Sequence, residues 1–70
     1  MSQPELSIIV PAYNEEDLIQ STLDGLYEYF SQRREQYEIL VVDDGSHDKT
    51  AARVEEWSKQ KDASLRLLRN

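Results

Sequence analysis

Residues 39–42, Ile-Leu-Val-Val, are apolar at every position and constrain the fold more than any other part of the chain. A strand with one face in water alternates apolar and polar side chains, whereas a continuously apolar strand is typical of a parallel sheet covered on both faces. Residues 6–10 predict a second buried strand, which is short, rich in β-branched side chains and ended by Pro11. Residues 65–68 form a third, weaker one. The sequence therefore predicts a parallel sheet with strands at about residues 6–10, 39–42 and 65–68.

Apolar side chains with helical spacing lie between the first two strands. They recur every three or four positions and predict one buried helix face: Ile19, Leu23, Leu26 and Phe30. Asn14 is expected to cap this helix, with the acidic residues 15–17 in its first turn and the basic residues 33–34 in its last. We therefore expect a helix over about residues 15–34.

A second helix is predicted at about residues 49–61, between the second and third strands. Asp48 is its expected N-cap, and Ala51, Val54 and Trp57 form its inner face. Trp57 and Phe30, both at helical spacing, are expected in the core.

The element order is therefore β-α-β-α-β, which predicts an α/β fold with a parallel sheet in the strand order 3-2-1. Right-handed crossovers place both helices on the same face of this sheet. The strands are nevertheless apolar on both faces, as Ile8 with Ile9 and Val41 with Val42 show. We expect these residues to be part of a larger domain, or a second chain to cover the bare face, as in a homo-oligomer.

Length and composition exclude several classes of protein. The chain has 70 residues with no cysteine and one histidine, which excludes a disulfide and argues against a nitrogen-ligated zinc site. Its net charge of −6 argues against a nucleic-acid binder, which needs a basic face. The longest apolar run has four residues and no basic, apolar leader opens the chain, so we expect no membrane span, no secretion signal and a cytoplasmic location.

Two loops carry the candidate site, because ligands of open parallel sheets bind beyond the carboxyl ends of the strands. These loops are residues 11–15 and residues 43–48. They bring together an aromatic ring, three carboxylates and a hydroxyl: Tyr13, Glu15, Asp43, Asp44 and Ser46. A ring can stack on a base, and carboxylates accept hydrogen bonds from base N–H and ribose hydroxyl groups, so the set suits a nucleoside. Neither a P-loop nor a G-x-G-x-x-G fingerprint occurs.

Two segments, residues 7–16 (SIIVPAYNEE) and residues 38–50 (EILVVDDGSHDKT), carry a family resemblance. In this order they resemble the start of a family 2 glycosyltransferase of the GT-A fold, most of all the dolichyl-phosphate glucose and mannose synthases. Residues 23–30 are similar to the glucose branch. The resemblance implies that residues 1–70 are the N-terminal part of one catalytic domain, the Rossmann-like half of its nucleotide-binding region.

The resemblance also implies roles for single residues. Five match positions that contact or line the nucleotide site: Pro11, Tyr13, Glu15, Val42 and Asp44. Asp44 matches the acid that reaches the base, whereas Asp43 and Ser46 are expected to shape the turn.

The implied reaction moves a hexose, with inversion, from a nucleotide sugar to a polyprenyl phosphate of the dolichyl type. UDP-glucose is the favoured donor and GDP-mannose the other candidate, and the parent enzyme is expected at the cytoplasmic face of a membrane. A divalent cation, Mg²⁺ or Mn²⁺, would stabilise the leaving diphosphate. The family holds it with a D-x-D motif, which does not occur in these 70 residues. We therefore expect no metal site, no catalytic residue and no transferase activity in this chain alone.

Two other readings compete with this one. Residues 39–44 also resemble the first strand and acidic pair of response-regulator receivers, but there the pattern opens the chain and here it comes second. The alternative that stays open is a non-catalytic nucleotide-binding or assembly module that pairs through its bare sheet face.

Overall fold

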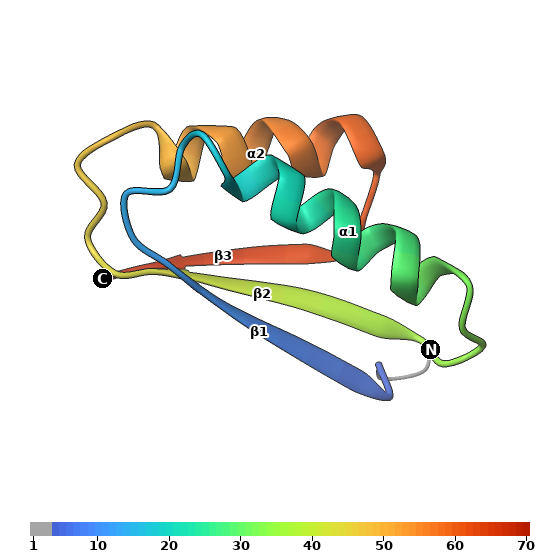
Figure 1. Ribbon diagram of the computed structural model, residues 1–70. Helices are drawn as coiled ribbons and strands as arrows, with labels where there is room; N and C mark the ends of the chain where they lie inside the picture. The colour runs from blue at the N-terminus through green and yellow to red at the C-terminus, as the bar shows by residue number, and fades with distance from the viewer. Residues whose placement is uncertain (1–3) are drawn as a thin grey trace.

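The computed structural model describes residues 4–70, which form a single sheet with two helices. The elements are β1 (Leu6–Ala12), α1 (Ile19–Ser31), β2 (Tyr37–Asp43), α2 (Thr50–Lys61) and β3 (Leu65–Arg69). The three strands are parallel and lie in the order β1-β2-β3. Both helices pack on the same face of the sheet (Figure 1). The predicted α/β class, strand order and one-sided helix layer are confirmed.

The hydrophobic core lies between the sheet and the helices. Its sheet side comes from alternate residues of the strands, with Ile39 and Val41 of β2 fully buried. Its helix side comes from the fully buried residues Ile19, Leu23 and Val54, together with Trp57. The spacing in α2 therefore predicts its buried face correctly, whereas of the four residues predicted on α1 only Ile19 and Leu23 are fully buried.

Trp57 anchors the two helices to each other. Its indole is buried, and Nε1 donates a hydrogen bond of 2.8 Å to Oδ1 of Asp24 on α1. The ring of Tyr27 meets the indole edge-on, with centroids 5.8 Å apart. Phe30 departs from the expectation, because it is only partly buried and packs against Tyr37 at the end of the core, with ring centroids 5.4 Å apart.

The other face of the sheet is the open face, which we define by Ile9, Pro11, Leu40, Val42 and Leu68. Side chains alternate along a strand, so these residues point away from the helices. Register pairs Ile9 with Leu40 and Pro11 with Val42, which places them side by side. Ile9 is 56% exposed and Leu68 51% exposed. The predicted bare apolar face is therefore present in the part of the chain that the structure describes.

The strands are longer than the predicted ranges of residues 6–10, 39–42 and 65–68. β1 continues through Pro11 and Ala12 because the parallel register with β2 runs on to the pair Ala12–Asp43. The backbone of Leu6 and that of Ala12 bond to the β2 side. By the alternation of a parallel ladder, Pro11 turns its backbone to the free edge, where the missing N–H breaks no bond to β2.

The first helix is shorter than the predicted residues 15–34. α1 begins at Ile19, and Leu18 occupies its N-cap position without a side-chain capping bond. Asn14 does not cap it, because Asn14 adopts a left-handed backbone conformation with φ of +50° four residues earlier. The acidic residues 15–17 form a turn before the helix, and Arg33 lies beyond its end, paired with Glu35 at 2.8 Å.

The second helix begins at Thr50, one residue after the predicted start, with Lys49 at the N-cap position. Asp48 still serves this helix end, because its Oδ1 accepts hydrogen bonds from the backbone N–H and the hydroxyl of Thr50. Among residues 4–70, neither helix has the length and apolar character needed to cross a membrane.

Candidate functional site

Two loops lie side by side at the carboxyl end of the sheet (Figure 1). The first rim loop, residues 13–18, joins β1 to α1, and the second rim loop, residues 44–49, joins β2 to α2. The backbone N–H of Asp44 still donates to the carbonyl of Ala12, at 2.9 Å, so the loops leave the sheet from adjacent positions. This is the edge where open parallel sheets bind their ligands.

Asp43, the last residue of β2, anchors the second rim loop. Its carboxylate is completely buried, and Oδ1 accepts hydrogen bonds from both the backbone N–H and the hydroxyl of Ser46. Its Oδ2 lies 3.4 Å from Nε of Arg69 on β3. The turn also needs Gly45, whose φ of +77° is strained for residues with a side chain.

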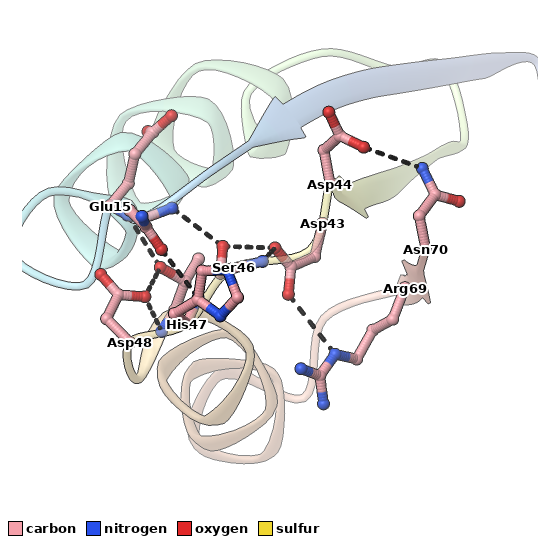
Figure 2. Close-up of polar contacts among 10 residues, drawn as sticks. Glu15, Asp43, Asp44, Ser46, His47, Asp48, Arg69 and Asn70 are labelled. Atoms are coloured by element: carbon pink, nitrogen blue, oxygen red, sulfur yellow. Dashed lines mark hydrogen bonds and ion pairs between the residues drawn. The ribbon is translucent and has the colours of Figure 1, made fainter.

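Asp44 points the opposite way from Asp43 (Figure 2). It is exposed, and Oδ1 accepts a hydrogen bond of 3.3 Å from the side-chain amide of Asn70. The two adjacent carboxylates therefore differ in setting. Asp43 faces the protein interior, and Asp44 is presented at the rim.

Hydrogen bonds fasten the two rim loops to each other. The backbone N–H of Asn14 donates to Oγ of Ser46 and that of Glu15 to Oγ1 of Thr50, at 2.8 and 2.7 Å. The N–H of Glu16 donates to Oδ2 of Asp48 at 3.2 Å. In the other direction, the N–H of His47 donates to Oδ1 of Asn14 at 2.8 Å. Figure 2 shows part of this hydrogen-bond network beside the buried Asp43.

The structure places the five predicted nucleotide residues around this rim. Pro11 and Val42 are register partners on the open face, directly below it. Tyr13 is 53% exposed and has no ring partner among the described residues. Glu15 is partly buried, and its Oε1 lies 3.5 Å from the N–H of Tyr13. A ring, two carboxylates and an apolar floor thus meet at one edge.

Local patterns missed the residues that connect the loops. The sequence predicts Asn14 and Asp48 as helix caps and gives Thr50 no role, but the side chains of all three bond across the rim to the other loop. Asn70 lies beside Asp44 only because β3 follows β2 in register. The residues that join the two loops are 32 to 35 positions apart, and Asn70 is 26 positions from Asp44, so local spacing carries no sign of these contacts.

The pKa of the Asp48 carboxyl lies below its ordinary value of 3.8, because the Thr50 hydroxyl hydrogen-bonds to its charged form, with help from the N–H groups of Thr50 and Glu16. The carboxylate is thereby held in the state that links both loops.

A divalent cation does not fit the residues described. Within residues 4–70, no group of three acidic or histidine side chains is placed to hold a metal ion. The same surface is open and encloses no pocket. No step of a reaction is therefore assigned to a metal on these residues.

Known proteins are similar to this chain in sequence. The family model described as "Glycosyl transferase family 2" matches residues 7–70. A dolichyl-phosphate beta-glucosyltransferase of Dictyostelium discoideum is 40% identical over 70 residues, which cover 91% of this chain and 21% of that protein.

Two solved structures are similar in fold. A mannosyltransferase of Pyrobaculum calidifontis, in complex with GDP-Man and Mn²⁺, superposes with a TM-score of 0.84 and 37% identity over 100% of this chain and 20% of that one. Glucosyl-3-phosphoglycerate synthase of Mycobacterium tuberculosis, in complex with Mn²⁺, UDP-Glc and glycerol 3-phosphate, has a TM-score of 0.70 and 27% identity, over 94% of this chain and 21% of that one. The chain spans about a fifth of the length of these proteins.

Proposed function

The chain belongs to glycosyl transferase family 2, and from this premise we propose that it forms the base-binding part of the nucleotide-sugar site of a hexosyltransferase. The observation that carries the proposal is the set of hydrogen bonds that join the two rim loops. These bonds hold Tyr13 and Asp44 at one edge of the sheet, although the two residues are far apart in the sequence. The rim therefore has a built geometry before any ligand arrives.

Each of the five residues has a chemical task in this proposal. The Tyr13 ring, free of other aromatic partners in the described chain, stacks on the base. Asp44 accepts a hydrogen bond from a base N–H, and Glu15 accepts one from the nucleotide. Pro11 and Val42 supply an apolar floor. The buried Asp43 and its partner Ser46 hold the loop that presents Asp44.

The donor we propose is UDP-glucose, with GDP-mannose as the second candidate. Uracil and guanine both carry an N–H donor that Asp44 can accept, so the carboxylate alone does not choose between them. The similarity to a dolichyl-phosphate beta-glucosyltransferase supports the glucose donor. The similarity to a mannosyltransferase in complex with GDP-Man supports the alternative.

We propose the acceptor, the location and the metal for a longer enzyme of which these residues form one part. Its acceptor is a polyprenyl phosphate, as the name of the glucosyltransferase relative suggests. We propose that it works at the cytoplasmic face of a membrane, where such a lipid acceptor would lie. A divalent cation would neutralise the leaving diphosphate there, held by residues other than those described. The 70 residues alone are expected to bind nucleotide and to transfer no sugar.

Titration of the ¹⁵N-labelled chain with UDP and with GDP tests this proposal. UDP should shift the amide signals of Tyr13 and Asp44, and Asp44→Ala should raise its Kd by about tenfold to a hundredfold, the usual worth of a hydrogen bond to a charged group. Asp62→Asn is the matched control, because Asp62 is an exposed acid on the helix-capping turn after α2, and asparagine tolerates its positive φ. An equal loss of affinity in both variants, or no binding of either nucleotide, would refute the proposal.

A second candidate function is an assembly module that pairs through the open face. It is favoured by Ile9 and Leu68, two large apolar side chains more than half exposed on one sheet surface. Sedimentation equilibrium should then show a dimer that Leu68→Lys dissociates. A monomer at all concentrations would exclude this function.

A further inference from the structure

Asn14 is the one residue of the first rim loop that bonds to the second loop through both its backbone and its side chain. Its backbone N–H donates to Oγ of Ser46, and its Oδ1 accepts from the N–H of His47, each at 2.8 Å. Its φ of +50° lies in the left-handed region, which asparagine tolerates better than most residues. The backbone conformation and both bonds together fit the residue to this place.

The bonds of Asn14 continue into the core. The Ser46 hydroxyl that accepts from Asn14 itself donates to Oδ1 of the buried Asp43, at the end of β2. The first rim loop follows β1 in the sequence, but these hydrogen bonds tie it to the end of β2. Tyr13 directly precedes Asn14, and Asp44 directly follows Asp43, so this chain of bonds spans the gap between the two proposed base contacts.

We propose that Asn14 is a positioning residue: through Ser46 and His47 it sets the spacing of the two rim loops, and hence of Tyr13 and Asp44, without touching the ligand. This inference rests on the proposed function, in which Tyr13 and Asp44 both contact the base. Asn14 then contributes to the nucleotide affinity indirectly, through its hydrogen bonds to the second rim loop.

Two substitutions separate the side chain of Asn14 from its backbone. Asn14→Gly keeps the positive φ without strain and removes only the acceptor for His47. Asn14→Asp keeps a carboxylate oxygen as that acceptor and also tolerates the left-handed conformation. Ser31→Ala is the matched control, because Ser31 bonds within α1 to Glu28, at the other end of the helix from the rim.

The experiment measures amide exchange in the 70-residue chain by NMR without nucleotide, and then the Kd for UDP. Loss of one neutral hydrogen bond is worth about a fivefold change. In Asn14→Gly, exchange at His47 should therefore rise about fivefold, exchange at the buried Val41 should stay the same, and the Kd should rise about fivefold. Asn14→Asp should restore the exchange at His47, and Ser31→Ala should change neither quantity.

Three results would overturn the inference. They are unchanged exchange at His47 in Asn14→Gly, an equal rise at Val41 that marks general destabilisation, and an unchanged Kd despite faster exchange at His47. If the unsubstituted chain binds neither UDP nor GDP, the proposed function fails by itself. The exchange at His47 then still decides whether Asn14 holds the two loops together.

Discussion

Asp43 and Arg69 lie directly opposite each other in the register of β2 and β3, with Nε of Arg69 3.4 Å from Oδ2 of Asp43. The carboxylate is fully buried, whereas the arginine is largely exposed, so Arg69 reaches in from the surface to face an oxygen that accepts no hydrogen bond within residues 4–70. The other carboxylate oxygen holds Ser46. The end of β2 thus depends on a charge that water does not reach.

Asp43→Ala should lower the free energy of unfolding by about 1–3 kcal/mol, because it leaves the buried N–H and hydroxyl of Ser46 without their acceptor. Urea unfolding followed by circular dichroism measures this. The neighbouring variant Asp44→Ala is the control, since within residues 4–70 its exposed carboxylate hydrogen-bonds only to the side-chain amide of Asn70, and it should cost less than about 0.5 kcal/mol. Equal costs for the two would contradict the structural role of Asp43.

Ile39→Ala should cost about 2–5 kcal/mol, because Ile39 is fully buried on the central strand. A chain of 70 residues has a total stability of only about 4–10 kcal/mol, so the variant should lose a large share of it and unfold at a lower urea concentration. The same substitution at Ile9, which is 56% exposed, should cost less than about 1 kcal/mol. The fluorescence of Trp57, the only tryptophan, reports both transitions. A similar cost at Ile9 would mean that the open face is covered in solution.

The free energy of unfolding should fall as the pH is lowered, and Asp48 should account for part of this loss. Its pKa is lowered in the folded state, mainly by the hydrogen bond from the Thr50 hydroxyl. Its contribution is therefore present above the ordinary value of about pH 4 and is lost as the pH falls through the lowered pKa. Urea midpoints between pH 2.5 and 7 should show a smaller acid loss in Asp48→Asn than in the unsubstituted chain. Parallel curves would show that Asp48 adds nothing to acid sensitivity.

Tyr13 should contribute to nucleotide affinity through its ring and not its hydroxyl. Stacking of a base on an aromatic side chain is worth about 1–3 kcal/mol, so Tyr13→Ala should raise the Kd for UDP by about fivefold to 150-fold. Tyr13→Phe keeps the ring and should bind within about twofold of the unsubstituted chain. Isothermal titration calorimetry distinguishes them. A large loss in Tyr13→Phe would assign the contact to the hydroxyl instead.

The sheet and both helices could be predicted because their signals are local. The apolar run at residues 39–42 indicated a buried parallel strand, and the spacing of Ile19 and Leu23 indicated a helix face. The start of α1 could not be predicted in this way. The N–H groups of Glu15 and Glu16 bond to Thr50 and Asp48 across the rim, the N–H of Leu18 bonds to the carbonyl of Glu15 in a turn, and the helix begins at Ile19.

The candidate site likewise has residues that local sequence patterns predict and contacts that they do not. The proposed base contacts, Tyr13 and Asp44, belong to motifs that lie within single loops. The bonds that set their spacing join positions more than 30 residues apart, so they became visible only in the folded chain. For Asn14 the local rule, an asparagine before an acidic turn, described a helix cap, whereas the folded chain uses its oxygen on His47.

Pro11 gives the free edge of β1 a built-in stopping point. Ser7 and Ile9 turn backbone N–H groups towards that edge, but Pro11, the next residue facing the same way, has none to offer. A strand that adds to the sheet there can bond to the N–H groups of Ser7 and Ile9, but at Pro11 it meets only a carbonyl acceptor. A strand that widens the sheet from that side would therefore find its last N–H donor at Ile9, before the first rim loop begins.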